Sequence, residues 1–95
     1  MVAYAVFIRD RLRDPATMRT YREKVGATFA GFGATARANH GAFEMLEGAA
    51  MESVVITEFP SIEAARAWYE SAAYREVRRL RHLSADYRAF IVEGL

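Results

Sequence analysis

The sequence predicts an α+β fold in which strands and helices follow one another in the order βαββαβ. Runs of β-branched and apolar residues alternate with segments of helical periodicity, and Asp-Pro and Pro-Ser pairs mark the helix starts. The chain has 95 residues, which leaves room for one hydrophobic core. We therefore expect a single domain over residues 1–95.

The first half of the chain predicts a strand, a helix and a second strand. Val2–Arg9 is apolar on both of its alternating faces, which is typical of a strand covered on both sides. Asp14 and Pro15 provide the N-cap and the first position of a helix. Apolar side chains at three- and four-residue spacing continue this helix until Gly31 and Gly33 end it. Ala34–Asn39 is the predicted second strand, which turns at His40-Gly41.

The second half repeats the alternation of strand and helix. Phe43–Glu47 is expected to form a short strand or an extended arm, and Glu52–Phe59 the third main strand. A Pro-Ser pair then begins a second helix. A further helical segment is predicted at Ala73–Leu83, followed by a break at Ser84–Asp86 and a last strand at Tyr87–Glu93.

This order is the split βαββαβ arrangement of ferredoxin-like domains, with a four-stranded antiparallel sheet and helices on one face. The first, third and last strands are apolar on both faces, but the two main helices can cover only one face. The other face would be a larger apolar patch than soluble monomers usually expose. Together with a hydrophobic share of 53%, this predicts a homodimer formed through the sheet face.

Composition excludes several classes of function. Thirteen basic and twelve acidic residues are interspersed and give a net charge of +1, which provides no attraction for nucleic acid or membrane. In the third strand, Val54–Thr57 offers no aromatic platform on which RNA bases could stack. The chain has no cysteine, and its two histidines lack metal-ligand spacing, so we expect no metal and no cofactor. The apolar run at the N-terminus is too short for a membrane span or signal peptide, which favours a cytoplasmic location.

The basic residues of the third helical segment form the one cluster of like charge. Arg75, Arg78, Arg79 and Arg81 have acidic residues nearby in the sequence, and we expect them to form a solvated, ion-paired face. His82 is interpreted as a solvated or C-terminal capping residue. The helix dipole is expected to stabilise its protonated form.

Asn39 and His40 are the first candidates for chemistry. An imidazole with a pKa near neutrality can act as a general base, and the adjacent amide can orient a substrate carbonyl. The alternative is that both are turn residues, because these residue types tolerate left-handed backbone angles.

The other candidates for substrate binding are aromatic or acidic. Tyr4 and Tyr21 are predicted to face each other across the gap between sheet and helix, where a small pocket could form. Trp68 either lines that pocket or belongs to the core. Glu58 is either a base with a raised pKa or the partner of an arginine such as Arg88 on a neighbouring strand, and we favour the ion pair.

Several segments resemble one bacterial family over essentially the whole chain. The matching segments are Glu44–Gly48, Val54–Ser61, Glu63–Ser71 with Tyr74, and Phe90–Gly94. They are similar to the family called domain of unknown function 1330, within the dimeric α/β-barrel superfamily. The resemblance implies a ferredoxin-like subunit whose sheet packs on that of its partner to form a barrel. The chain departs from the family pattern at Asn39-His40-Gly41, where Arg-Gly-Gly is common.

The superfamily includes cofactor-free monooxygenases and isomerases that act on small organic molecules in a pocket beside the sheet. The first hypothesis is a cofactor-independent enzyme of monooxygenase or isomerase type, with His40 as the base and with Asn39, Tyr4 and Tyr21 orienting the substrate. The alternative is a non-catalytic homodimeric module that binds a small ligand or is structural. The enzyme hypothesis requires His40 to open onto a pocket. The alternative gains support if Met18, Phe29 and Trp68 fill the gap completely.

Overall fold

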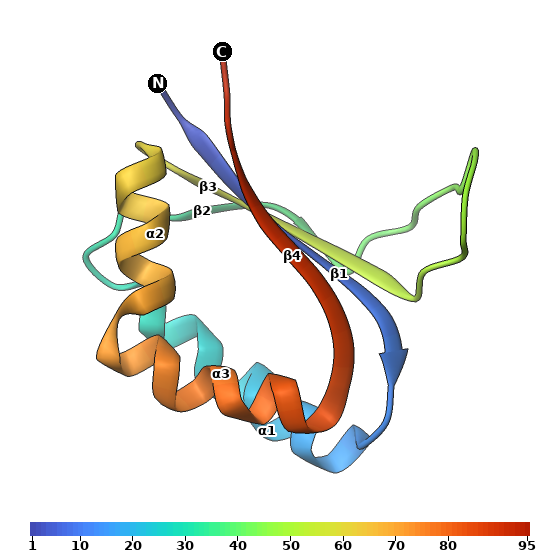
Figure 1. Ribbon diagram of the computed structural model, residues 1–95. Helices are drawn as coiled ribbons and strands as arrows, with labels where there is room; N and C mark the ends of the chain where they lie inside the picture. Colours follow the sequence, from blue (N-terminus) through green and yellow to red (C-terminus); the bar gives the residue numbers. More distant parts are fainter.

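The computed structural model describes residues 1–95 and contains a four-stranded antiparallel sheet with helices on one face (Figure 1). The strands are β1 (Ala3–Leu12), β2 (Thr35–Asn39), β3 (Ser53–Phe59) and β4 (Ala85–Glu93), in the spatial order β2-β3-β1-β4. The helices are α1 (Pro15–Val25), the 3-10 helix η1 (Gly26–Phe29), α2 (Ile62–Glu70) and α3 (Ala72–Ser84). The predicted ferredoxin-like fold is therefore confirmed.

Side-chain caps start the three α-helices where the sequence places them. Asp14 accepts hydrogen bonds from the backbone N–H of Thr17 at 3.2 Å and from its hydroxyl at 2.6 Å. Ser61 accepts from the Ala64 N–H at 3.0 Å. Ser71 separates α2 from α3 by accepting from the Tyr74 N–H at 3.3 Å. Each cap satisfies a backbone donor that the first helical turn leaves unpaired.

Three predicted boundaries are wrong for identifiable reasons. The first strand continues beyond Arg9 to Leu12, because its last residues still pair with β4. The first helix ends at Val25, and Gly26 begins a tighter 3-10 turn, because glycine weakens the α-helix and such turns are common at helix ends. No break separates α3 from β4. The Ser84 carbonyl accepts the backbone N–H groups of Arg13 and Asp14 at 2.8 and 2.9 Å, so the helix end is satisfied without a loop.

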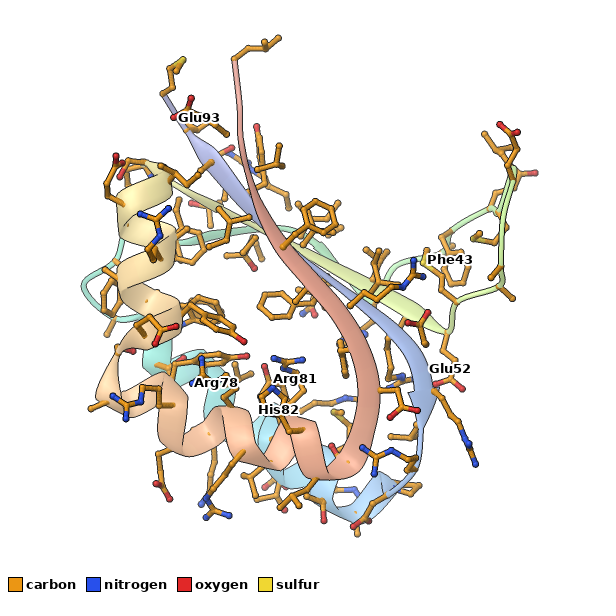
Figure 2. The ribbon with its side chains drawn as sticks, viewed as in Figure 1. Phe43, Glu52, Arg78, Arg81, His82 and Glu93 are labelled. Atoms are coloured by element: carbon orange, nitrogen blue, oxygen red, sulfur yellow. The ribbon has the colours of Figure 1, made fainter.

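Residues 40–52 form an extended arm between β2 and β3, so Phe43–Glu47 is not a strand. The arm projects away from the helices and carries Phe43 (Figure 2). Its ends are held by backbone bonds from His40 N–H to Val54 and from Glu52 N–H to Arg9, at 3.0 and 2.8 Å. Leu46 is 86% exposed. The arm is therefore anchored at its base and exposes Leu46 next to the acidic Glu47.

The two faces of the sheet differ in what covers them. On β1, Ala3, Ala5 and Phe7 point toward the helices and are buried, and the residues between them point to the opposite, open face. Cross-strand pairing places an apolar set on this open face, comprising Tyr4, Val6, Ile8, Val54, Ile56, Phe90 and Val92. The prediction that the strands are apolar on both faces is confirmed.

Aromatic rings form the core between the sheet and the helices. Trp68 on α2 is 1% exposed, and its ring centroid lies 4.7 Å from Phe29 and 4.1 Å from Tyr74. Phe7 on β1 meets Trp68 edge-on at 5.9 Å. These contacts attach α2 and η1 to the sheet. None of the helices combines the length and the apolar sequence needed to span a bilayer.

Candidate functional site

A cavity of about 310 Å³ lies between the sheet and the helices, within the size range of small-molecule sites. Its lining is contributed by all four strands, α1, η1, α2 and α3, and comprises Phe7, Met18, Tyr21, Arg22, Val25, Gly26, Phe29, Ala36, Asn39, His40, Val55, Thr57, Trp68, Arg81 and Tyr87. Met18, Phe29 and Trp68 line this space and do not fill it.

Four of the predicted residues meet at this cavity. Asn39 ends β2 opposite Val55, on the sheet face that turns toward the helices. His40 follows directly and also lines the cavity. Tyr21 from α1 and Trp68 from α2 complete the set. The fold thus brings together residues that are up to 47 positions apart in the sequence (68 − 21).

His40 is a turn residue whose side chain also lines the cavity. Its φ of 58° makes it the one non-glycine residue with a left-handed backbone, which confirms the turn interpretation. The same turn directs its side chain to the cavity, where its Nδ1 is hydrogen-bonded to the hydroxyl of Ser53, a buried residue on β3. When Nδ1 donates this bond, Nε2 has a free lone pair.

The electrostatic surroundings of His40 favour the neutral imidazole. Partial burial lowers its pKa below the ordinary value, and the positive charges of Arg22 and Arg9 lower it further. A neutral imidazole at pH 7 can accept a proton, which is the property that a general base needs.

Arg81 is the principal residue that sequence reasoning missed. It was expected on a solvated, ion-paired face, but it is only 3% exposed and lines the cavity. Figure 2 shows its side chain extending from α3 into the space between helix and sheet. Its guanidinium carbon lies 5.1 Å from the ring centroid of Phe7 and 4.9 Å from that of Tyr87.

The helical spacing contained a signal for this burial. Arg81 is seven residues after Tyr74 and four after Val77, so it lies on the same inward stripe of α3 as these two buried residues. The rest of the basic cluster points elsewhere. Arg78 lies within 3.7 Å of Glu70, and Arg79 within 3.2 Å of Glu76, as predicted for an ion-paired face.

A chain of hydrogen bonds connects Arg81 to two buried tyrosines. The Nε–H group of Arg81 donates to the Tyr74 hydroxyl at 3.3 Å, and this hydroxyl is 2.9 Å from that of Tyr21. Burial raises the pKa of Tyr21, and the neighbouring Tyr74 raises it further. The Tyr21 phenol therefore stays protonated, and the two hydroxyls position the guanidinium at the cavity wall.

Tyr4 does not face Tyr21, so this predicted arrangement is wrong. Tyr4 pairs across the sheet with Glu58 and Val92 on the open face, whereas its neighbours Ala3 and Ala5 point toward the helices. A strand that is apolar on both faces contains no local signal for which alternating set turns inward. Here the two alanines leave room for the helices to pack closely.

Glu58 forms an ion pair, as favoured, but with a different arginine. Its carboxylate lies 3.2 Å from the guanidinium of Arg37, and Arg88 pairs with Asp10 at 2.9 Å. The strand order explains the choice, because β2 lies beside β3 whereas β1 separates β3 from β4. Glu58 therefore lies outside the cavity, on the open face.

His82 does not behave as the helix-dipole argument predicts. Partial burial and then the charges of Arg81 and Arg78 lower its pKa. The C-terminal carbonyls of α3 are bound by Arg13, whose guanidinium donates to His82 and Leu83 at 2.8 and 3.1 Å. No cluster of three or more His, Cys, Asp or Glu side chains is placed to hold a metal ion.

The charge balance of the cavity is one-sided. Its lining contains two arginines and no aspartate or glutamate. Arg22 is exposed and borders the opening together with Asn39 and His40, whereas Arg81 lies deep. No carboxylate lies within 4.0 Å of either guanidinium. The site therefore combines a partly exposed imidazole, an amide and unpaired positive charge with aromatic side chains.

Comparison with known families identifies one match. The family model described as "Domain of unknown function (DUF1330)" matches residues 2–95. No curated protein matches the chain.

Solved structures with the same fold cover nearly the whole chain. A protein of unknown function from Rhodopseudomonas palustris is 24% identical, with a TM-score of 0.74 over 99% of this chain and 82% of that one. A dimeric ferredoxin-like protein of unknown function from Bacteroides fragilis is 13% identical, with a TM-score of 0.65 over 98% and 96%. SnoaB, a cofactor-independent oxygenase from Streptomyces nogalater, is 11% identical, with a TM-score of 0.63 over 99% and 92%. At these identities the likeness concerns the fold.

Proposed function

The chain belongs to the family of unknown function DUF1330, and from that premise we propose that it is a homodimeric, cofactor-independent enzyme for a small organic molecule. The substrate would bind in the cavity between sheet and helices, in each subunit. One observation carries the proposal: His40, oriented by Ser53 and with its pKa lowered by burial and by nearby arginines, lines a cavity of about 310 Å³ beside Asn39.

The open face of the sheet supports the homodimer. Its apolar set contains Phe90 and Val92, which are 51% and 46% exposed in the single subunit. A second sheet packed on this face would bury both side chains and form the barrel that the resemblance implies. The Bacteroides fragilis protein with the same fold is described as dimeric. We propose the same assembly for this chain.

The proposed chemistry begins with proton transfer to His40. Its Nε2 would take a proton from a carbon next to a substrate carbonyl, while the Asn39 amide donates to the carbonyl oxygen. Return of the proton to a different carbon gives an isomerase. Alternatively, the carbanion can itself reduce dioxygen, so that a CH₂ group and O₂ become a carbonyl group and water. SnoaB is described as a cofactor-independent oxygenase, which makes oxygenation the first reaction to test.

Proton exchange provides a test that needs no knowledge of the natural substrate. The protein would be incubated in D₂O with a panel of 1,3-diketones and polyphenols, with deuterium incorporation followed by NMR and dioxygen uptake by an electrode. We expect His40→Gln to slow exchange by about 10²–10⁴-fold, the usual contribution of a general base. His82→Gln changes the other histidine, which lies outside the cavity lining, and should leave the rate unchanged. Equal rates in wild type and His40→Gln would refute the role of His40.

A non-catalytic binding module is the second candidate, and Arg81 is the observation that favours it. Arg81 is the most deeply buried charged group in the cavity, and a guanidinium stays protonated at neutral pH, so it can bind a ligand but cannot act as a general base. If ligands bind saturably in the cavity but no compound of the panel exchanges or consumes dioxygen, the binding module is the better description.

A further inference from the structure

The strongest unexplained feature of the molecule is the positive charge of Arg81. The residue is 3% exposed, and no carboxylate of the chain lies within 4.0 Å of it. A charge removed from water is costly unless a counter-charge and hydrogen bonds compensate it. Buried arginines are therefore expected to have an anionic partner, and this one has none within the subunit.

Most of the hydrogen-bonding capacity of Arg81 is also unused. A guanidinium carries five N–H donors. Nε donates to the Tyr74 hydroxyl at 3.3 Å, and Nη2 lies 3.4 Å from Nε2 of His82, but Nη1 makes no hydrogen bond. The residue lines the cavity, so donors without a protein partner are available to a ligand there.

Two features of the fold lower the cost of the charge but do not neutralise it. Arg81 lies in the last turn of α3, where the helix dipole favours a cation, and its guanidinium lies near the rings of Phe7 and Tyr87. Both effects hold the guanidinium in place. Neither supplies a full negative charge or accepts the donors of Nη1.

The rest of the cavity narrows the class of ligand. No acidic residue lines it, and Arg22 adds a second positive charge at the opening, so the site favours an anion. Five of the fifteen lining residues are Phe, Tyr or Trp, and such rings suit a planar apolar body. A guanidinium edge matches the two oxygens of a carboxylate by parallel hydrogen bonds, whereas a phosphate has a further oxygen that needs other donors.

We infer that the cavity binds an organic carboxylate with a planar apolar body, and that Arg81 pairs with the carboxylate group. This inference rests on the proposed function, because it names the chemical class of molecule that the same cavity accepts. Arg81 is assigned a binding role, and proton transfer remains with His40.

The test compares two probes of the same shape and different charge. Benzoate and its neutral analogue benzamide would be titrated into the full-length protein, with binding followed by NMR and by thermal stabilisation. We expect benzoate to bind at least about tenfold more tightly, as a charge-assisted hydrogen bond pair predicts. Equal binding of the two probes would leave the pocket intact but overturn the assignment of Arg81.

Variants of one helix provide the matched control. Arg81→Met should lose at least about tenfold in benzoate affinity and retain benzamide binding. Arg75→Met changes an exposed arginine on the same helix and should bind both probes as the wild type does. Wild-type affinity for benzoate in Arg81→Met would refute the pairing.

The unfolding temperature distinguishes a ligand-binding arginine from a purely structural one. Loss of a purely structural arginine would lower this temperature. Removal of a buried charge that has no counter-charge relieves the cost of its desolvation, and this gain offsets the lost contacts with Tyr74, Phe7 and Tyr87. We therefore expect Arg81→Met to unfold at the same temperature as the wild type or higher. A clear fall would mean that the charge is compensated within the protein, against the inference. If Arg81→Met does not fold, Arg81→Lys retains the charge without the planar fork, and it should bind benzoate more weakly than the wild type does.

Failure of the two proposals can be distinguished. If benzamide binds as tightly as benzoate, a small-molecule site exists and only the carboxylate inference fails. If neither probe nor any compound of the proton-exchange panel binds at millimolar concentration, the proposed function fails as well.

Discussion

The two faces of the sheet differ in how their charged side chains are satisfied. On the open face, Arg37 pairs with Glu58 and Arg88 pairs with Asp10. On the side covered by the helices, Arg9 of β1 pairs with Glu52, but Arg81 of α3 is buried without a carboxylate. A surface whose charges are paired and whose remaining residues are apolar is suited to packing. A surface that leaves donors unpaired around a cavity is suited to a ligand, because the missing partner has to come from outside the chain.

The largest effect should come from the core of the covered face. Trp68→Ala is expected to lower the free energy of unfolding by about 3–5 kcal/mol, because the ring is fully buried against Phe29 and Tyr74. Urea unfolding measures this loss. Met45→Ala on the exposed arm should change stability by less than about 0.5 kcal/mol. A small effect of Trp68→Ala would mean that the core does not depend on this ring.

The next effect concerns the open face and the proposed dimer. Val6→Lys places a charge at the centre of the apolar set and should weaken association by about 3 kcal/mol, since a charge would be buried without a partner. Sedimentation velocity at micromolar concentration measures the shift from dimer to monomer. Leu83 lies on α3, away from this face, and is 60% exposed. Leu83→Lys is therefore the control and should leave association unchanged. If the wild-type chain sediments as a monomer, the proposal that this face forms the dimer interface is refuted.

A smaller effect should come from the hydroxyl pair behind Arg81. Tyr21→Phe removes one partner of the 2.9 Å contact with Tyr74 and is expected to cost about 1–2 kcal/mol of unfolding free energy. Thermal unfolding measures the change. Tyr69→Phe makes the same chemical change at a tyrosine whose hydroxyl has no hydrogen bond in the structure, so little change is expected there.

The smallest effect is a pH dependence from the histidines. Folding lowers the pKa of His40 and of His82 below 6.5, by burial and by neighbouring arginines. As the pH falls below about 6.5, the unfolded chain therefore binds more protons than the folded chain does. Stability should be complete above pH 7 and fall as the pH decreases toward the folded-state pKa values. Urea unfolding at several pH values gives the unfolding free energy as a function of pH. This free energy should change less steeply with pH for His40→Gln than for the wild type.

Local patterns were sufficient for the elements and for part of the site. The caps Asp14 and Ser61 determine where helices start, because they act on neighbouring backbone groups. Asn39 and His40 could be singled out because a turn residue with a titratable ring stands at the end of a strand. The burial of Arg81 could have been read from its spacing to Tyr74 and Val77, but the neighbouring acidic residues suggested a solvated face.

By itself, the sequence determined the order of strands and helices, their caps and the presence of apolar residues on both faces of the central strands, since these follow from side-chain period and short-range bonds. Only the tertiary structure decided that Ala5 and not Tyr4 faces the helices, that Glu58 pairs with Arg37, and that a cavity remains around Arg81. The physical reason is that the alternation of side chains along a strand determines which residues share a face. Which neighbour covers that face depends on how distant segments pack.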